Sequence, residues 1–301
     1  MIRQIVVHDN CADGLASAMI LRLKFPEAAI VFLNYNTPEL AAFQPGPGQL
    51  WCDFSPPPER AQAFADAGAY ILDHHKTARD VVAMFGERGM FGDESTEPGV
   101  SGAVLAARHV LYGYPARGMS LSALANQVID FARLVGIRDT WQKDHPDWQE
   151  ACELSEALRF WPRETWLQAA PSEWPRLAEI GPVLIQRHAA ECQQTIKRAF
   201  RDTVEGIRVV LFQGGSSVTS DSAEIVGDAA DLVVGFGYGV EGDVPSVLYS
   251  LRSRTGFDCG AMGKNFGGGG HSGAGGFKRR VWSDPYGQFL GLLKTYLEDT
   301  R

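Results

Sequence analysis

Asp73, His74 and His75 form a polar stretch directly after the apolar run 70–72. This pattern indicates a buried strand that carries a carboxylate and two imidazoles to the edge of an open sheet, where α/β proteins build their sites. Neighbouring residues on a strand point to opposite faces, so both histidines can serve one centre only if the chain turns there. Residues 76–77 are typical of such a turn. An isolated Asp-His-His can also be a plain surface feature.

Two other apolar runs also end in potential metal ligands, which favours a site. The β-branched run 2–7 leads into a polar loop that contains His8 and Asp13, and the run 50–52 leads directly into Asp53. A helical pattern follows the first loop. The loop could therefore hold an anion or a divalent cation, or Asp13 could simply cap the helix.

Strands and helices alternate through the first 75 residues, which predicts a parallel sheet whose strands all end at one edge. The acids and imidazoles are then expected to meet at that edge, where burial without cations would cost several kcal/mol. Divalent ions remove that cost, and mixed oxygen and imidazole ligands suit Mn²⁺ or Mg²⁺ better than a structural zinc site. Two ions that share Asp53 would form a hydrolase site that polarises a phosphoryl group and activates a bridging water.

Asp139 is a further candidate ligand. It follows the helical pattern 121–134 and a glycine break at Gly136, from which a carboxylate could return to the sheet edge. Alternatively, Asp139 pairs with Arg138 or caps the next segment.

Composition limits the class of protein. A chain of 301 residues with 45% hydrophobic and 21% charged residues is expected to form two globular domains. No apolar run reaches about 18 residues, so we expect a cytoplasmic protein without membrane contact. The five cysteines are scattered and lack Cys-x-x-Cys spacing, which indicates reduced thiols. The net charge of −8 argues against coating long nucleic acid, but it allows a short phosphorylated substrate.

The second half of the chain has a different pattern. Residues 147–202 have a helical composition, and their four tryptophans are expected to fill a helical core. The amphipathic segment 183–201 is expected to link two domains. Short strands follow at 207–212, 232–236 and 247–251, which predicts a second α/β unit.

The stretch 267–276 contains seven glycines, among them Gly268, Gly269 and Gly270, and one histidine, His271. It is either a flexible linker or a backbone that approaches an anion closely, with His271 as a donor. Charge favours the anion, because Asp258 is the only acid between residues 245 and 280, where six basic residues occur.

Together, Asp73-His74-His75, the loop 8–14, Asp53, Asp139 and the stretch 267–277 resemble the DHH phosphoesterase superfamily with its DHH-associated C-terminal domain. In layout the chain is most similar to the nanoRNase and cyclic-dinucleotide phosphodiesterase branches. The resemblance implies an α/β fold with three parts: a parallel-sheet catalytic domain over 1–182, a linker helix over 183–204 and a smaller α/β substrate-binding domain over 205–301.

The resemblance also implies roles for individual residues. Two Mn²⁺ ions are expected, with His8 and Asp53 on one, and four ligands on the other, namely Asp13, Asp53, His74 and Asp139. His75 is expected to contact the scissile phosphate. Arg252 and the glycine-histidine stretch, with Gly268, Gly269, Gly270 and His271, are expected to bind the far end of the substrate.

Cys11 departs from the family pattern, which has an aspartate at this position as a ligand of the first ion. Either Cys11 binds as a thiolate, which favours an ion softer than Mn²⁺, or the first metal site is weak.

The expected activity is hydrolysis of phosphodiester bonds in short oligonucleotides, linearised dinucleotides or a 3′-phosphoadenosine nucleotide. Two alternatives stay open: a phosphoanhydride hydrolase that acts on polyphosphate, and a nucleotide-binding protein with a degenerate first metal site. A homodimer also stays open.

Overall fold

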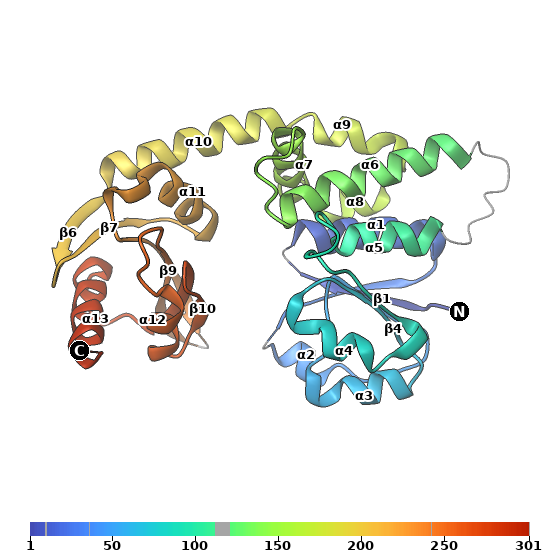
Figure 1. Ribbon diagram of the computed structural model, residues 1–301, viewed down its shortest axis with the longest axis horizontal. Coiled ribbons are helices and arrows are strands. Elements are labelled where there is room, and N and C mark those ends of the chain that lie inside the picture. Colours follow the sequence, from blue (N-terminus) through green and yellow to red (C-terminus); the bar gives the residue numbers. More distant parts are fainter. Residues whose placement is uncertain (10, 36, 112–120, 242, 301) are drawn as a thin grey trace. The chain divides into compact units, whose positions relative to one another are not determined.

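The computed structural model describes residues 1–9, 11–35, 37–111, 121–241 and 243–300, and it divides into two compact units, Met1–Ile185 and Gln186–Arg301. The boundary between the units falls within helix α10, Gly181–Arg198 (Figure 1). None of the described helices is long and apolar enough to span a membrane.

The first unit is built on a parallel sheet of five strands in the order β2-β1-β3-β4-β5. The strands are β1 (Gln4–His8), β2 (Ala29–Leu33), β3 (Gln49–Cys52), β4 (Tyr70–Asp73) and β5 (Gly89–Phe91). The predicted parallel sheet is confirmed, and its carboxyl-terminal edge is where the polar residues of the sequence motifs follow the strands.

Alternate residues of each strand enter two separate cores, as the two-residue period of a strand requires. Ile5 and Val7 pack with α1 (Ala12–Lys24) and α5 (Gly102–Leu111), whereas Val6 packs on the opposite face of the sheet. That face is covered by α2 (Pro38–Ala42), α3 (Pro58–Asp66) and α4 (Arg79–Ala83), as Figure 1 shows. The short 3₁₀ turns η1 (Lys76–Ala78) and η2 (Gly86–Arg88) flank α4.

Four more helices form a second layer over α1 and α5 (Figure 1). They are α6 (Leu121–Asp139), α7 (Trp148–Phe160), α8 (Arg163–Gln168) and α9 (Trp174–Ala178), with η3 (Pro171–Glu173) before α9. Trp166 and Trp174 are buried in this core, as the sequence predicted.

Two local predictions were wrong. Helix α1 begins at Ala12, so Asp13 lies in its first turn rather than in the polar loop before the helix. Helix α6 continues through Gly136 without a break. This glycine instead allows close packing, since a Cβ atom there would lie only 2.2 Å from the carbonyl oxygen of Gly99.

The second unit contains a mixed sheet in the order β10-β11-β9-β8-β7-β6, in which only β7 and β8 are parallel among the described strand pairs. Helix α11 (Ser216–Val226) and the turn η4 (Gly227–Ala229) connect these two strands, and α12 (Cys259–Asn265) and α13 (Pro285–Asp299) complete the unit. The strands are β6 (Phe200–Val204), β7 (Ile207–Gln213), β8 (Leu232–Glu241), β9 (Val244–Arg252), β10 (Gly269–His271) and β11 (Ala274–Arg280).

The glycine-rich stretch is neither a linker nor an irregular loop. Its residues form most of the antiparallel hairpin of β10 and β11. Gly275 allows α12 to pack closely, because a Cβ atom there would lie 2.3 Å from the carbonyl oxygen of Cys259. Close packing within the unit therefore accounts for part of the glycine content.

Candidate metal centre

Segments far apart in sequence deliver acids and imidazoles to the carboxyl-terminal edge of the first sheet. His8 is the last residue of β1, Asp53 follows β3 and His74 follows β4, and these three strands are neighbours. Asp13 lies in the first turn of α1 and Asp139 is the last residue of α6. The structure therefore brings together all five residues that the sequence singled out as metal ligands.

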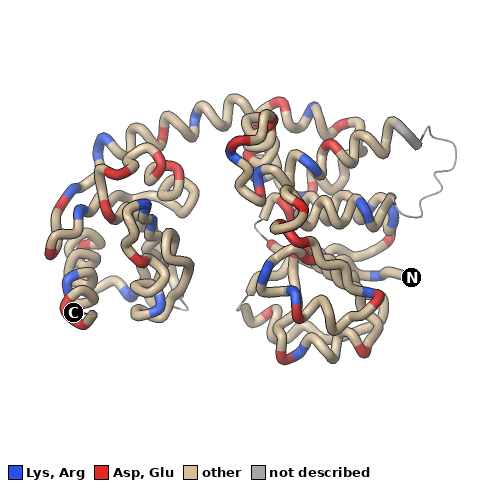
Figure 2. The backbone as a smooth tube through the Cα atoms, viewed as in Figure 1, with Lys and Arg blue, Asp and Glu red and all other residues tan. Residues whose placement is uncertain are grey.

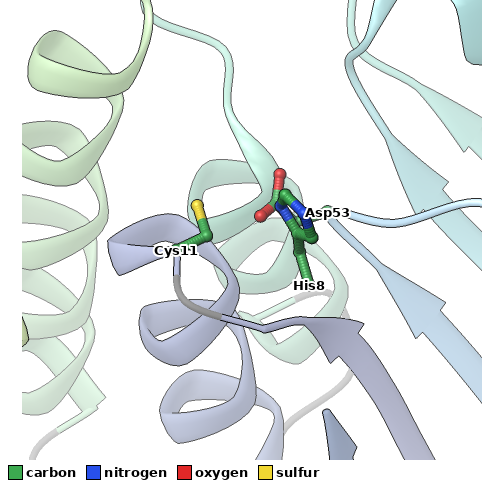
Figure 3. A group of neighbouring side chains, drawn as sticks. All are labelled: His8, Cys11 and Asp53. Atoms are coloured by element: carbon green, nitrogen blue, oxygen red, sulfur yellow. The ribbon is translucent and has the colours of Figure 1, made fainter. Parts of the chain in front are cut away.

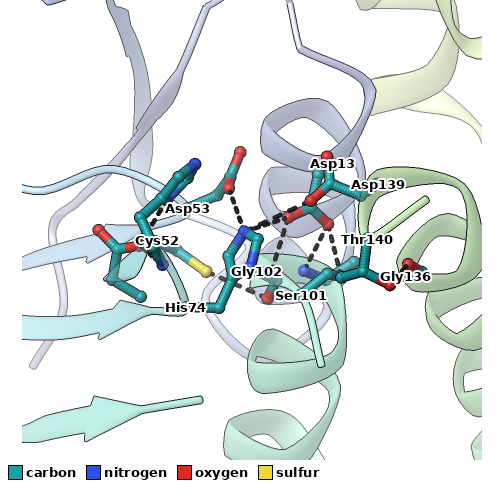
Figure 4. Close-up of polar contacts among 12 residues, drawn as sticks. Asp13, Cys52, Asp53, His74, Ser101, Gly102, Gly136, Asp139 and Thr140 are labelled. Atoms are coloured by element: carbon teal, nitrogen blue, oxygen red, sulfur yellow. Dashed lines mark hydrogen bonds and ion pairs between the residues drawn. The ribbon is translucent and has the colours of Figure 1, made fainter. Parts of the chain in front are cut away.

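His74 lies at the centre of this group (Figure 4). Its Nε2 atom faces three carboxylates, at 3.3 Å from Asp53, 3.5 Å from Asp139 and 3.7 Å from Asp13. Its Nδ1 atom lies 3.3 Å from a carboxylate oxygen of Glu94. A neutral ring that donates Nδ1–H to Glu94 presents the Nε2 lone pair to the three acids, which is the arrangement of a metal-binding imidazole.

Asp13 is held in place by the start of helix α5. Its Oδ1 atom accepts hydrogen bonds from the Ser101 hydroxyl and the Ala103 N–H, both at 2.8 Å, and its Oδ2 atom accepts from the Gly102 N–H at 2.6 Å. The N-terminus of a helix stabilises a carboxylate. These bonds fix the orientation of Asp13, which is only 1% exposed.

Asp53 has an unusual backbone conformation for a residue with a side chain, with φ at 56°. Left-handed conformations are costly for most L residues but are better tolerated by Asp and Asn. The Asp53 side chain also packs closely against Gly102: a Cβ atom on Gly102 would lie 2.4 Å from the Asp53 Cβ. The Oδ2 atom of Asp53 is buried without a hydrogen-bond partner among the described residues.

The charges in this group are unbalanced. The ion pairs of Asp13, Asp53 and Asp139 within the described chain are made with His74, and none is made with Lys or Arg. Burial, followed by repulsion from Asp13, raises the pKa of Asp139 to about 6 and also raises the pKa of Asp53. Burial alone would lower the pKa of His74, but Asp13 and Asp139 outweigh it and the net shift is upward.

These features fit a bound cation. The Asp13, His74 and Asp139 ligand atoms lie within 4.8 Å of one another, as do those of Asp53, His74 and His75. A buried carboxylate oxygen without a partner and three acids around one imidazole are expensive unless an ion compensates them. The donors are mainly oxygen atoms, which suit Mn²⁺ and Mg²⁺.

A second group of candidate ligands lies beside the first. Ligand atoms of His8, Cys11 and Asp53 lie within 4.8 Å of one another, and their side chains point toward a common space in Figure 3. The His8 ring stacks on Phe54 at a centroid distance of 5.5 Å, which holds it in position. Burial, then the charge of Asp53, raises the pKa of the Cys11 thiol.

Asp73 and His75 form a separate pair at the same edge. The Nδ1 atom of His75 lies 2.8 Å from the Asp73 Oδ1 atom, while the Ser55 hydroxyl donates to Oδ2. Burial would lower the pKa of His75, but the Asp73 carboxylate outweighs it and the net shift is upward. The His75 side chain is 39% exposed, and a nitrogen of its ring lies within 4.8 Å of ligand atoms of Asp53 and His74.

In the second unit, the strand register places Arg252 and His271 in one row, because both are paired with Ala274 of the strand between them. Directly paired residues point to the same face of a sheet. The Arg252 guanidinium donates to the hydroxyls of Ser220 at 2.9 Å and Ser216 at 3.0 Å, and no carboxylate among the described residues pairs with it. This positive charge without a counter-ion suits an anion.

Lys and Arg residues also occur along β9, α12 and β11 (Figure 2). Of the glycines predicted to bind substrate, Gly268 packs against the backbone of Gly276: a Cβ atom on Gly268 would lie 2.0 Å from the Gly276 carbonyl oxygen. Gly270 has a φ of 134°, and a Cβ atom on Gly269 would meet no other atom within 4 Å.

The sequence reasoning did not identify four residues that support the centre. Glu94 positions His74, Ser101 and Gly102 form the start of α5, and Ser55 holds Asp73. Serine is a typical residue before the first turn of a helix, so its position directly before an apolar helical pattern could have identified Ser101. Glu94 stands in a loop of mixed polar residues, where the sequence gives no indication of its partner.

The chain has the fold of a solved DHH-family phosphoesterase, RecJ, over 98% of its length. RecJ from Thermus thermophilus, solved in complex with Mn²⁺, aligns with a TM-score of 0.51 at 17% identity, covering 98% of this chain and 52% of RecJ. The chain thus spans about half of RecJ, and at this identity the likeness shows a common fold.

Two further structures align at slightly lower TM-scores. An exopolyphosphatase-related protein from Bacteroides fragilis gives 0.49 at 12% identity, with 99% of this chain and 93% of that chain covered. The pGpG-specific phosphodiesterase PggH from Vibrio cholerae gives 0.48 at 13% identity, with 99% of both chains covered. No protein-family model matches the sequence, and no curated protein was found to match it.

Proposed function

We propose that this protein is a metal-dependent phosphodiesterase that hydrolyses short oligonucleotides or linearised dinucleotides, with the first unit as its catalytic domain. The observation that carries the proposal is the convergence of Asp13, Asp53 and Asp139 on the Nε2 atom of His74, with no Lys or Arg paired to them in the described chain. A divalent cation would compensate this charge and also satisfy the buried Oδ2 atom of Asp53.

Asp53 is the residue that would join two ions. It belongs both to the group around His74 and to the group with His8, so its two oxygens can serve different ions. The oxygen-rich set of Asp13, Asp53, His74 and Asp139 suits Mn²⁺ or Mg²⁺, and a second divalent ion would lie between His8 and Asp53. When bound, such ions polarise a phosphoryl group and activate a water molecule. Binding of Mn²⁺ by RecJ, which has the same fold, supports this choice.

The protein groups around this centre are positioned before substrate arrives. Three hydrogen bonds from the start of α5 hold Asp13, and Glu94 holds the His74 ring. Fixed donors and ligands of this kind lower the reorganisation needed in the transition state.

His75 is the candidate for contact with the scissile phosphate. Because Asp73 accepts from Nδ1 and raises the pKa of the ring, His75 can carry a proton on Nε2 and donate a hydrogen bond to a phosphate oxygen. In this role His75 would stabilise the negative charge that grows on the phosphoryl oxygens during attack.

The second unit would bind the rest of the substrate. Arg252 and His271 lie on one face in one row of the sheet, in a segment where basic residues outnumber acids. The chain as a whole carries a net charge of −8, which favours a substrate with few phosphates over a long nucleic acid.

The test is a hydrolysis assay of the full chain with Mn²⁺ over a panel of di- to pentanucleotides, linear and cyclic dinucleotides, 3′-phosphoadenosine nucleotides and polyphosphate. We expect turnover of the short phosphodiesters. Asp53→Asn should reduce this turnover by more than about 100-fold, because even outer-shell partners of metal sites contribute about 10–100-fold.

Asn is the matched substitution at this position, since it tolerates the left-handed backbone and removes the negative charge. The far-ultraviolet circular dichroism spectrum should therefore be unchanged. Full activity in Asp53→Asn would overturn the site assignment, and turnover of polyphosphate alone would overturn the proposed substrate class.

A further inference from the structure

The group of His8, Cys11 and Asp53 differs chemically from its neighbour. It offers one imidazole nitrogen, one sulfur and one carboxylate oxygen within 4.8 Å of one another. The neighbouring group of Asp13, His74 and Asp139 offers an imidazole nitrogen and only oxygen atoms besides. A sulfur atom is therefore available on one side of Asp53, and Figure 3 shows Cys11 at the start of α1 beside His8 and Asp53.

The backbone fixes this sulfur near the imidazole. His8 ends β1 and Cys11 immediately precedes α1, so both lie where the first strand and the first helix meet. The helix starts close to the strand end, because a Cβ atom on Gly14 would lie 2.3 Å from the carbonyl oxygen of His8. The side chains of both residues are partly buried, and Asp53 is 1% exposed.

The unpartnered Oδ2 atom of Asp53 is an independent indication of a ligand in this region. Thiolate ligands favour zinc and other soft ions, whereas carboxylates favour Mn²⁺ and Mg²⁺. Three protein ligands of mixed nitrogen, sulfur and oxygen type also match catalytic zinc sites, which leave a fourth position for water or substrate.

We propose that Cys11 is a thiolate ligand of the first metal site, and that this site selects Zn²⁺ or Co²⁺ while the oxygen-rich site selects Mn²⁺ or Mg²⁺. The centre is then a mixed-metal one, with Asp53 between two unlike ions. This inference rests on the proposed two-ion function and specifies the chemistry of one half of its site.

The first experiment uses Co²⁺ as the probe, because a thiolate bound to Co²⁺ gives a sulfur-to-metal charge-transfer band in the near ultraviolet. Metal-free full-length protein is loaded with one equivalent of Mn²⁺ and then titrated with Co²⁺. We expect the band to appear and saturate at one Co²⁺ per chain. Cys11→Ser should abolish the band and weaken Co²⁺ binding by more than about 100-fold, which exceeds the loss of an outer-shell partner.

The second experiment measures metal content after equilibration with one equivalent of Zn²⁺ and a large excess of Mn²⁺, followed by gel filtration, because most sites bind Zn²⁺ more tightly than Mn²⁺ at equal concentration. The unsubstituted protein should retain one of each ion. Cys11→Asp, which replaces sulfur with oxygen, should shift the retained ions toward two Mn²⁺. Cys152→Ser is the control, because Cys152 lies in α7 outside this group and is also partly buried, and it should behave like the unsubstituted protein.

These outcomes separate the inference from the function on which it rests. Two bound Mn²⁺ with no charge-transfer band, or a band that persists in Cys11→Ser, would overturn the role of Cys11 and leave the phosphodiesterase proposal standing. Failure to bind any ion in both unsubstituted protein and Cys11→Asp, when both show native circular dichroism, would overturn both.

Discussion

The two units form their polar sites by opposite means. In the first unit, side chains from separate segments converge on His74, and the like charges of the three acids require a cation to balance them. In the second unit, a glycine-rich hairpin brings backbone strands close together and leaves Arg252 beside hydroxyl groups on one face of the sheet. Both sites contain a glycine at a point of close approach. Carboxylate side chains lie against Gly102, and the backbone of the neighbouring strand lies against Gly270. Substitutions of glycine at the two sites should therefore fail in different ways.

Gly102→Ala should give the largest effect. The new methyl group would lie 2.4 Å from the Asp53 Cβ and 2.8 Å from the Asp13 Oδ2 atom, so both carboxylates must move. Displacements of about 1 Å in a catalytic site cost on the order of 100-fold in rate. We expect that loss in kcat with Mn²⁺, together with about 1–3 kcal/mol of stability from overpacking.

The control is Gly291→Ala in α13, where a Cβ atom meets nothing within 4 Å. It should leave turnover unchanged and stabilise the helix slightly, since Ala has the higher helix propensity. Equal activity in both variants would contradict the role of Gly102.

Glu94→Ala should have the next largest effect. It removes the partner of His74 Nδ1, and loss of such partners weakens metal binding by about 10–100-fold. Calorimetric titration with Mn²⁺ measures the change. Glu94→Gln keeps an acceptor oxygen and should recover most of the Mn²⁺ affinity. An equal loss of Mn²⁺ affinity in both variants would indicate that the negative charge of Glu94, and not its hydrogen bond to His74, supports metal binding.

Gly270→Ala should act on substrate binding rather than on chemistry. Its φ of 134° is unfavourable for alanine, and the new Cβ atom would lie 2.3 Å from the carbonyl oxygen of Ala274. A distorted hairpin should raise KM several-fold and leave kcat nearly unchanged. The strained backbone should also lower the free energy of unfolding by about 1–3 kcal/mol. Gly269→Ala is the matched control, with open space at its Cβ position. A fall in kcat with constant KM would assign the hairpin to catalysis instead.

The smallest expected effect is on stability and concerns His109 in α5. Burial, with a contribution from Lys24, lowers the pKa of His109 to about 4. Between pH 6.5 and about 4 the unfolded chain binds a proton that the native chain does not, so stability falls as the pH falls through this range.

The loss should be on the order of 1 kcal/mol once solvent screening at this partly exposed site is considered. Urea unfolding at about pH 7 and about pH 4.5, on either side of the unfolded-state pKa, compares the unsubstituted protein with His109→Gln, which stays neutral. If the free energy of unfolding depends on pH in the same way in both proteins, the lowered pKa of His109 is contradicted.

Much of the first unit could be predicted because each strand is a short apolar run that ends in a polar residue. His8 ends β1, and Asp53 and His74 directly follow β3 and β4, so a parallel sheet was enough to bring them together. Asp13 and Asp139 could be assigned to the site only through the resemblance to known motifs or through weaker sequence patterns, because both lie on helices rather than at strand ends. The expected break at Gly136 was wrong because a glycine inside a helix can serve close packing as well as termination.

The remaining parts depend on contacts across long stretches of sequence. Ser101 and Asp13 are 88 residues apart, and nothing local to either residue indicates the hydrogen bond between them. The sequence did not predict the hairpin of β10 and β11, since glycine is depleted from strands and hides their alternating pattern. Its register places His271 and Arg252 in one row, which no spacing in the sequence shows.

Asp53 belongs to two groups of ligand atoms, one with His8 and Cys11 and one with His74 and His75, and this shared position has a thermodynamic consequence. Whatever occupies one group alters the affinity of the other, and linkage requires the two influences to be equal in size. Titration curves for either ion would then describe a coupled pair rather than independent events, so the order of addition should change the apparent constants but not their product.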